Sequence, residues 1–365
     1  MKKVLIITNI PSPYRVEFFN QLGKKCDLTV LFEKRQSDER DESWNNYKFE
    51  FFKGIFLHGK SIAVDMAICL DVIKYVKDSS FDCIICMDFI TPTGMLAIQY
   101  MKMHKIEYWL ESDGGFVKSG RGIKEKIKKY FIKDAKGYFS TNKEHDNYYV
   151  RYGAEREKIV RYPFSSITKQ DLEVEIKNLN ENKEKKRKRL EITEDKIILS
   201  VGQFIYRKGF DLLLEVAKNL PKSVGIYIIG GKPTQEYLEI KEKYQLDNIH
   251  FLGFKLKKEL GDYYDCADLF VFPTREDIWG LVINEAMAHA LPVITTMKCG
   301  AGIELIQNEK NGYLIPADSL TALDKAIRNG LEDRFLTNAR LKSFETIQNY
   351  TIENMVEYHI KILKL

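Results

Sequence analysis

Short apolar runs rich in β-branched residues alternate with segments of helical periodicity along the chain. In the first half, buried strands fit the runs "KKVLIITN", "DLTVLFE", "FDCIICMDF", "IEYWLES" and "KGYFSTN", and a helix fits "YRVEFFNQLGKKC". Nearly continuous apolar runs of this length are typical of strands that are buried on both faces of a parallel sheet. The pattern therefore predicts parallel βαβ units with helices on both sheet faces.

The same alternation restarts near Asp195. Strands fit "DKIILSVGQ", "VGIYIIGG", "IHFLGF", "ADLFVFPT" and "LPVITT", and helices fit "GFDLLLEVAKNL" and "QEYLEIKEKYQ". We therefore expect an α/β protein with two successive open α/β domains, in residues 1–170 and 195–345. Residues 171–194 are expected to form a charged linker, and residues 346–365 a final helix that packs back toward the N-terminal domain.

Composition agrees with two folded domains. The chain has 365 residues, of which 44% are hydrophobic and 30% charged, and a mild formal charge of +5 that says little about partners. The apolar run at the N-terminus is too short for a signal peptide, and no run approaches the roughly 18 residues of a spanning helix. These features predict a cytoplasmic protein. Cys83 and Cys86 form C-x2-C inside a strand pattern, which favours packed, reduced thiols over a metal site.

The basic run from Lys183 to Arg189 raises the question of nucleic-acid binding. No aromatic residue is interleaved with the run, and no nucleic-acid module surrounds it. We therefore interpret it as a solvated connecting helix and expect no nucleic-acid partner.

The loop after the first strand, "TNIPSPYRVEFF", contains no glycine, so a dinucleotide fingerprint is absent there. Pro11 and Pro13 predict a stiff turn, and Arg15 enters the first turn of the following helix. Arg15 is expected either to face a phosphate or to be a plain surface arginine.

The first expected strand of the second domain, "DKIILSVGQ", leads into the stretch "SVGQFIYRKGF". Gly202 lets the chain turn off the strand, and Arg207 and Lys208 stand just before Gly209 and an apolar helix. Two cations beside a helix start predict a phosphate site, because the helix dipole adds to their charge.

The stretch "TREDIWGLVINEAMA" runs from a strand through a loop into a helix. The main-chain amides of Gly280, Leu281 and Val282 are expected to be unpaired at the helix start, where they suit an anion or sugar oxygens. Glu285 lies about one turn into the helix and could accept hydrogen bonds from a ribose diol. The alternative is a capping acid followed by a surface glutamate.

Together with "NIPSPYRVEFFNQL", "LESDGGF" and "KNGYLIP", these motifs resemble the retaining GT-B glycosyltransferases of family four, the glycosyl transferases group 1 type, over nearly the whole chain. That family includes enzymes of bacterial capsule, O-antigen and lipopolysaccharide assembly. The resemblance implies a GT-B fold, with two Rossmann-like domains facing each other across a cleft and the nucleotide sugar bound mainly on the second.

The resemblance also implies residue roles. Glu285 ends the family's Glu-x7-Glu pattern and would hold the ribose, and Asp277, not Glu276, takes the place of the first acid and would bond the donor sugar. Lys208 matches the lysine that neutralises the donor diphosphate. The residues implied in catalysis are Asp113, Lys208, Asp277 and Glu285, and those implied in donor binding are Arg15, Gly202, Gln203, Arg207, Lys208, Asp277, Gly280, Leu281, Val282 and Glu285.

Some positions depart from the family's pattern. Many relatives carry arginine where this chain has Gln203, and Arg207 could replace that charge. A histidine that often lines the N-terminal side of the site has no counterpart here. Glu111 and Asp113 of "WLESDGG" are the acids offered instead. Either could contact the donor sugar or the acceptor hydroxyl, and loop capping is the alternative for Asp113.

The activity implied is that of a metal-independent, retaining hexosyl- or glycosyltransferase (EC 2.4) without cofactor. It would use a UDP- or GDP-sugar and act on a glycan or polyprenyl-diphosphate-linked acceptor in surface polysaccharide biosynthesis. The alternatives are a sugar-nucleotide epimerase of the same fold, for which no clear acid/base set is visible, and a non-catalytic sugar-nucleotide-binding protein.

The segment Phe116–Phe139 has eight basic and two acidic residues. Its Ile123, Ile127, Phe131 and Ala135 recur every fourth residue, which predicts an amphipathic helix. Such a helix could lie on an anionic membrane surface at the inner face of the plasma membrane. The alternative is that the apolar stripe packs on the sheet while the lysines are solvated.

Overall fold

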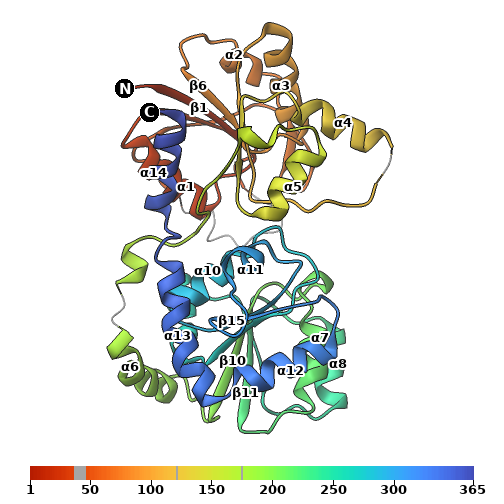
Figure 1. Cartoon of the computed structure of the whole chain (residues 1–365), viewed down its shortest axis with the longest axis vertical. Coiled ribbons are helices and arrows are strands. Elements are labelled where there is room, and N and C mark those ends of the chain that lie inside the picture. Colours follow the sequence, from red (N-terminus) through yellow and green to blue (C-terminus); the bar gives the residue numbers. More distant parts are fainter. Residues whose placement is uncertain (37–46, 121, 174–175) are drawn as a thin grey trace. The chain divides into compact units, whose positions relative to one another are not determined.

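A computed structural model describes residues 1–36, 47–120, 122–173 and 176–365. The chain divides into two compact units (Figure 1). The first comprises Met1–Ser166 and Thr351–Leu365, and the second comprises Ile167–Tyr350. Arg121 of the expected amphipathic segment and residues 174–175 of the expected linker lie outside the described residues.

The first unit is built on a parallel sheet with the order β3-β2-β1-β6-β7-β8-β9. Its strands are β1 (Lys3–Thr8), β2 (Asp27–Phe32), β3 (Lys53–Phe56), β6 (Cys83–Cys86), β7 (Trp109–Glu111), β8 (Gly137–Ser140) and β9 (Ile159–Arg161), and a separate hairpin joins β4 (Lys60–Ala63) to β5 (Met66–Ile68). Its helices are α1 (Pro13–Gly23), α2 (Val72–Val76), α3 (Pro92–His104), α4 (Ile123–Ile132), α5 (Lys143–Arg151) and α14 (Ile352–Leu363). Short 3-10 turns at Arg156–Lys158 and elsewhere complete the connections.

The C-terminal helix α14 belongs to the first unit, where it lies beside α1 (Figure 1). Thr351 caps it by accepting a hydrogen bond from the amide of Asn354. Ile352, Met355 and His359 are buried at a spacing of three to four residues, as an amphipathic helix requires. The ring of His359 stacks on Phe139 of β8 with centroids 4.2 Å apart, so the helix is fixed to the sheet.

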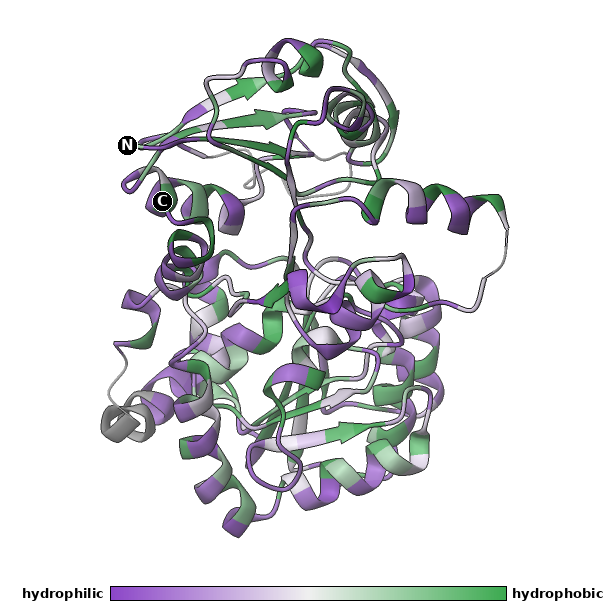
Figure 2. Cartoon of the chain, turned by 45° about the horizontal axis from the view of Figure 1, so that its top comes forward, coloured by the Kyte–Doolittle hydropathy of each residue, from purple (hydrophilic) through white to green (hydrophobic). Residues whose placement is uncertain are grey.

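The second unit repeats the plan with the parallel order β12-β11-β10-β13-β14-β15. Its strands are β10 (Lys196–Val201), β11 (Val224–Ile229), β12 (Ile249–Leu252), β13 (Leu269–Phe272), β14 (Val293–Thr296) and β15 (Gly312–Ile315). Its helices are α6 (Ile176–Arg189), α7 (Phe210–Ala217), α8 (Gln235–Lys243), α9 (Lys257–Cys266), α10 (Leu281–Ala288), α11 (Gly300–Leu305), α12 (Leu320–Gly330) and α13 (Asp333–Ile347). The central strands of both sheets are mostly apolar (Figure 2), and their apolar side chains are buried, which confirms the expected buried strands and the α/β class.

The basic run expected to be a solvated linker is instead part of the second unit. Helix α6 packs against α9, and its basic side chains pair with aspartates on and just after that helix. The pairs are Lys183–Asp268, Lys186–Asp262, Lys186–Asp265, Arg187–Asp268 and Arg189–Asp262. The expectation of a solvated run is therefore wrong. The sequence pattern could not show this, because the acidic partners are far away in sequence and only the fold brings them to α6.

Both sheets reverse their strand order once, between β1 and β6 in the first unit and between β10 and β13 in the second. In open α/β sheets, ligands bind beyond the carboxyl ends of the strands at this reversal. The loops after β1, β6, β10 and β13 are therefore the places to look for functional residues.

Candidate active site

Lys208 and Asp277 meet at the reversal point of the second sheet, after β10 and β13. The Lys208 Nζ donates to Asp277 Oδ2 at 2.6 Å, and each side chain is only 13% exposed. Nζ also lies 4.9 Å from the ring centroid of Phe272. Gly202 lies against the lysine stem, since a Cβ there would come 3.6 Å from the Lys208 Cδ and Cε atoms. The structure thus brings three of the predicted site residues together.

The loop that carries Asp277 is anchored on both sides. The Asp277 amide donates to the carbonyl of Lys298 at 2.8 Å, and the Gly300 amide donates to the Asp277 carbonyl at 3.0 Å. On the preceding side, Arg275 is paired with Asp211 at 2.6 Å. The position of the Asp277 carboxylate is therefore set by backbone contacts, independently of Lys208.

Arg207 contributes a second cation beside this pair. Its Nη1 donates to the carbonyl of Glu276 at 2.8 Å and lies 3.5 Å from Asp277 Oδ2, and its side chain is 48% exposed. Arg207 therefore lies close enough to the site to supply the positive charge that Gln203 lacks, as the sequence suggested. Arg207 lies near the same Asp277 carboxylate that pairs with Lys208.

The start of α10 presents main-chain donors. Gly280 has φ 97°, in the left-handed region that favours glycine, and a Cβ there would lie 2.8 Å from the Cys299 sulfur. Across the described ranges, the amides of Gly280, Leu281 and Val282 donate to no protein acceptor. Three free amides at a helix start favour an anion or sugar oxygens.

Glu285 lies one turn into α10 and is held from α9. The hydroxyl of Tyr264 donates to Glu285 Oε2 at 3.1 Å, whereas no residue in the described part of the chain donates to Oε1. Burial raises the pKa of Glu285, and the hydrogen bond from Tyr264 offsets part of that rise. Glu285 is half-buried, so the alternative interpretation as a surface glutamate is wrong.

Sequence reasoning missed the residues that support this site. Tyr264 and Phe272 looked like ordinary apolar positions of a helix and a strand. Trp279 is buried, and its Nε1 donates to Asn284 Oδ1 at 2.8 Å, which anchors the turn before α10. The apolar run "ADLFVFPT" indicated a buried strand around Phe272, but no pattern indicated which polar group each of these side chains meets.

The predicted acids of the first unit form a different kind of site. Glu111, at the end of β7, is fully buried. Its Oε1 accepts from Arg15 Nη1 at 3.0 Å and from the Tyr162 hydroxyl at 2.9 Å, and its Oε2 lies 3.0 Å from His359 Nε2. Although burial raises the pKa of Glu111, the contacts with His359 and Arg15 lower it to about 2. The expectation that Glu111 could contact sugar or acceptor is wrong, because both its oxygens are occupied away from solvent.

Arg15 and Asp113 extend this network toward the surface. Arg15 is 5% exposed, so the alternative of a plain surface arginine is wrong. Its guanidinium pairs with Asp113, which also accepts from the Tyr14 hydroxyl at 2.6 Å. Asp113 is 27% exposed, and its carboxylate is taken up by these two side chains instead of capping its own loop. A phosphate contact of Arg15 and a catalytic role of Asp113 stay predictions.

His145 in the first unit is buried beside Ser112, whose Oγ lies 3.0 Å from His145 Nε2. Burial lowers the pKa of His145 to about 3, so the imidazole is neutral near pH 7. The amide of Thr141 donates to Nδ1 at 3.3 Å, which places the ring proton on Nε2. His145 is therefore a donor that holds Ser112, not a base that activates it.

Among the described residues, no helix combines the length and the apolar character needed to cross a membrane.

A comparison with protein-family models matches residues 181–349 to the family described as "Glycosyl transferases group 1". In Haemophilus influenzae, an uncharacterised glycosyltransferase is 28% identical over 181 residues, which are 46% of this chain and 49% of that protein. In Rhizobium meliloti, the lipopolysaccharide core biosynthesis mannosyltransferase LpsB is 33% identical over 151 residues, which are 38% and 42%. The chain thus spans about half the length, or less, of these curated relatives.

Comparison with solved structures extends over the whole chain. The structure of Anabaena HepE in complex with UDP matches with a TM-score of 0.78 at 14% identity, covering 100% of both chains. At this identity the likeness shows the fold alone. Together with the two parallel sheets, it confirms the predicted GT-B fold with two Rossmann-like units.

Proposed function

Residues 181–349 belong to the glycosyl transferases group 1 family, and from this premise we propose that the protein transfers a sugar from a UDP- or GDP-sugar to a glycan or lipid-linked acceptor. The observation that carries the proposal is the Lys208–Asp277 pair at the reversal point of the second sheet, close to helix α10 with its free amides. Bacterial surface polysaccharide biosynthesis is the proposed setting, supported by the similarity to LpsB, a lipopolysaccharide core biosynthesis mannosyltransferase.

In this proposal the second unit stabilises the departing nucleoside diphosphate. Negative charge develops on the diphosphate as its bond to the sugar breaks, and fixed cations and amide donors stabilise that charge most strongly. Lys208 and Arg207 supply the cations, and the amides of Gly280, Leu281 and Val282 supply uncharged donors. Asp277 takes up one N–H of the Lys208 ammonium, which leaves further donors for phosphate oxygens.

Two carboxylates orient the donor. Glu285 Oε1, which has no protein donor in the described ranges, accepts from the ribose hydroxyls. Asp277 accepts from hydroxyls of the donor sugar while its own backbone is fixed by Lys298 and Gly300. Correct placement of the reacting carbon lowers the barrier because the entropy cost of orientation is met on binding.

The proposed reaction retains the anomeric configuration and needs no metal. The bond from the anomeric carbon to the diphosphate oxygen breaks, and the acceptor oxygen forms its bond on the same face. The acceptor proton passes to the departing phosphate, so no strong protein base is required. This route suits a site whose nearest basic side chains, Lys208 and Arg207, are cations.

A panel of UDP- and GDP-sugars tests the proposal. Each is incubated with the protein and a lipid-linked glycan extract, with and without chelator, and nucleoside diphosphate and products are quantified. We expect one donor to give a sugar transferred with retained anomeric configuration, both with and without chelator. An epimerised nucleotide sugar, binding without turnover, or complete dependence on added metal would each contradict the proposal.

We further propose that helix α4 of the first unit contacts an anionic membrane surface. Ile123 and Ile127 are 76% and 43% exposed, whereas Ile132 is fully buried. The expected apolar stripe is therefore packed on the unit only at its C-terminal end, through Phe131 and Ala135. The remaining part of the stripe is free to insert at the level of lipid headgroups.

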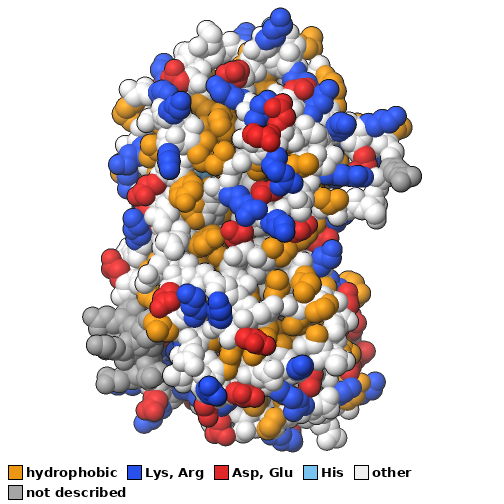
Figure 3. Space-filling view, viewed as in Figure 1, with side chains coloured by type: hydrophobic (Ala, Val, Ile, Leu, Met, Phe, Trp, Pro, Cys, Tyr) orange, Lys and Arg blue, Asp and Glu red, His pale blue; other side chains and the backbone are white. Residues whose placement is uncertain are grey.

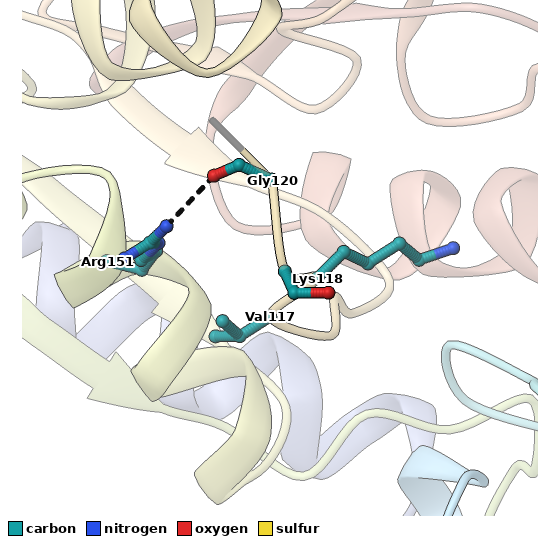
Figure 4. A pocket seen from close by; sticks show the side chains of 5 residues that line it. Val117, Lys118, Gly120 and Arg151 are labelled. Atoms are coloured by element: carbon teal, nitrogen blue, oxygen red, sulfur yellow. Dashed lines mark hydrogen bonds between the residues drawn. The ribbon is translucent and has the colours of Figure 1, made fainter. Parts of the chain in front are cut away.

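Positive charge surrounds this exposed stripe (Figure 3). Lys124, Lys126 and Lys129 are exposed on α4. An open hollow just before the helix is lined by Val117, Lys118, Ser119, Gly120 and Arg151, with Arg151 bonded to the Gly120 carbonyl at 3.3 Å (Figure 4). Basic residues near a membrane surface contribute roughly 1 kcal/mol each with anionic lipids.

Vesicle sedimentation tests this contact. Replacing Lys124, Lys126, Lys128 and Lys129 together by glutamine should release the protein from vesicles rich in phosphatidylglycerol. Replacing the exposed lysines Lys218, Lys222, Lys325 and Lys342 of the second unit in the same way is the charge-matched control and should leave binding unchanged. Equal binding of both variants would overturn the proposal.

A further inference from the structure

Tyr264 connects the acid Glu285 to a polar network that runs away from the site. Its ring is buried against Phe270 of β13 with centroids 5.8 Å apart, so the hydroxyl has one fixed direction. That hydroxyl lies 3.1 Å from Glu285 Oε2 and 3.5 Å from the carbonyl of Val282. Because a phenol O–H has a single proton, the donated bond goes to the closer, charged acceptor.

The ring of Tyr264 is in turn fixed by His289, at the end of α10. The two rings stack with centroids 5.2 Å apart at an interplanar angle of 15°. His289 Nδ1 lies 2.6 Å from Asp265 Oδ1, and the other oxygen of Asp265 pairs with Lys186 of α6. Although burial raises the pKa of Asp265, hydrogen bonds from His289 and Lys186 hold it below its ordinary value. Asp265 therefore stays ionised and keeps His289 in place.

We propose that Tyr264 is the positioning residue of the nucleotide site: it holds Glu285 through Oε2 so that Oε1 stays turned toward the ribose diol, and the His289–Asp265–Lys186 chain locks Tyr264 in that orientation. This inference rests on the proposed function, in which Glu285 binds the ribose. It adds that helix α6, through Lys186, is coupled to donor affinity.

The hydrogen bond from Tyr264 also favours the ionised form of Glu285. Burial raises the pKa of that carboxyl, and the opposing influences come from Tyr264, Lys257 and His289, while Asp171 raises the pKa further. Lys257 and Asp171 are paired with each other at 2.8 Å, so much of their effect on Glu285 cancels. Removing the Tyr264 hydroxyl should raise the pKa of Glu285. The affinity for the donor should then begin to fall at a higher pH when the solution is acidified.

The test is Tyr264→Phe, which removes the hydroxyl but keeps the ring that stacks on His289. Calorimetric titration with the free nucleoside diphosphate gives a readout that does not depend on turnover. We expect Kd to rise about fivefold to tenfold, less than the roughly tenfold or larger effect of losing a direct hydrogen bond to a charged group, because Tyr264 acts on the ribose only through Glu285. KM for the donor should rise similarly and kcat should change less than about twofold. Tyr263→Phe is the matched control, since no hydrogen bond of the Tyr263 hydroxyl is formed in the described part of the chain.

A nucleotide that lacks the ribose diol distinguishes positioning of Glu285 by Tyr264 from a merely structural role of Tyr264. With a 2′,3′-dideoxyribonucleoside diphosphate, wild type and Tyr264→Phe should bind equally, because the diol that Glu285 would hold is missing. An equal penalty on ribo- and dideoxy-nucleotide would overturn the inference, as would Tyr264→Phe behaving like Tyr263→Phe toward the ribonucleotide. Failure of the wild type to bind or turn over any nucleotide sugar would instead overturn the proposed function.

Discussion

Both units place a cation shortly after their first strand, β1 or β10, and a carboxylate at the end of a later strand or just after it, but they use these charges differently. In the second unit, the Lys208–Asp277 pair is partly exposed and lies at a loop that leads to three amides without a protein acceptor among the described residues. In the first unit, Arg15 and Glu111 are almost fully buried, and both Glu111 oxygens are occupied by protein donors. A charged side chain with an unused hydrogen-bonding position can bind a ligand. A charged side chain whose positions are all taken by protein groups can only stabilise the fold.

This comparison teaches how to separate binding residues from structural ones. In both units a cation pairs with a carboxylate beyond the strands of a parallel sheet, so the presence of such a pair does not distinguish the two kinds of residue. The number of protein partners and the exposure of the side chain do distinguish them. Glu285 keeps one oxygen without a protein donor among the described residues, whereas both oxygens of Glu111 have protein partners. The variants below should therefore lose activity in the second unit and stability in the first.

The largest effect is expected for Lys208→Ala. Removing the cation nearest the developing charge should lower kcat/KM about a thousandfold, as loss of one preorganised charge stabiliser does. Thermal unfolding should change little, since Lys208 is not a core residue. Lys218→Ala, which removes an exposed lysine of the same unit, is the control for turnover. Equal turnover of the two variants would show that Lys208 does not face the diphosphate.

Glu111→Gln should affect stability instead. It leaves the buried Arg15 guanidinium without one of its two carboxylates, and breaking a buried ion pair costs about 3 kcal/mol or more. Urea unfolding measures this loss. Glu107→Gln removes an exposed partner of Lys136 near the same strand and should cost less than about 1 kcal/mol. A Glu111→Gln protein as stable as Glu107→Gln would contradict the structural role.

The difference in stability between wild type and Glu111→Gln should depend on pH. The folded-state pKa of Glu111 is about 2, below its ordinary value of 4.5, so its ionised form stabilises the fold fully above pH 4.5. That contribution should decline as pH falls from 4.5 toward 2, and the stability gap between wild type and Glu111→Gln should close over the same range. A gap that is constant down to pH 2.5 would contradict the assigned pKa shift.

The smallest effect is expected for Arg207→Gln. The arginine is about half exposed and lies 3.5 Å from Asp277, so solvent screens its charge. We expect kcat/KM to fall about fivefold to tenfold, and the loss to shrink at higher ionic strength because screening weakens an exposed charge. A loss as large as that of Lys208→Ala would mean that Arg207 is the principal diphosphate ligand.

Much of this architecture could be predicted from the sequence. The β-branched runs indicated the strands of both sheets, because continuous apolar segments bounded by turn residues have few other structures open to them. The strands β3, β9 and β15 and the hairpin of β4 and β5 were not identified, because most of their side chains are exposed or only partly buried and form no continuous apolar run. The choice of Asp277 over Glu276 came from counting back eight residues from Glu285, and the structure places the Asp277 carboxylate against Lys208.

Long-range partners could not be predicted. Nothing in the residues around Glu111 indicates that His359, 248 positions later, completes its hydrogen bonds. In the same way the basic run of α6 looked solvated because its aspartate partners on α9 are about 80 positions away. Sequence periodicity reports which face of an element is buried, but the partner of a buried charge depends on the tertiary fold.

The most direct test of the central claim compares Asp277→Ala with Glu276→Ala in donor turnover. These neighbours are alike in charge, but the Asp277 carboxylate is the one paired with Lys208. Loss of kcat/KM by about a hundredfold or more in Asp277→Ala, with Glu276→Ala within about threefold of wild type, is the predicted result. Normal turnover in Asp277→Ala, or an equal loss in both variants, would contradict the assignment of the nucleotide-sugar site.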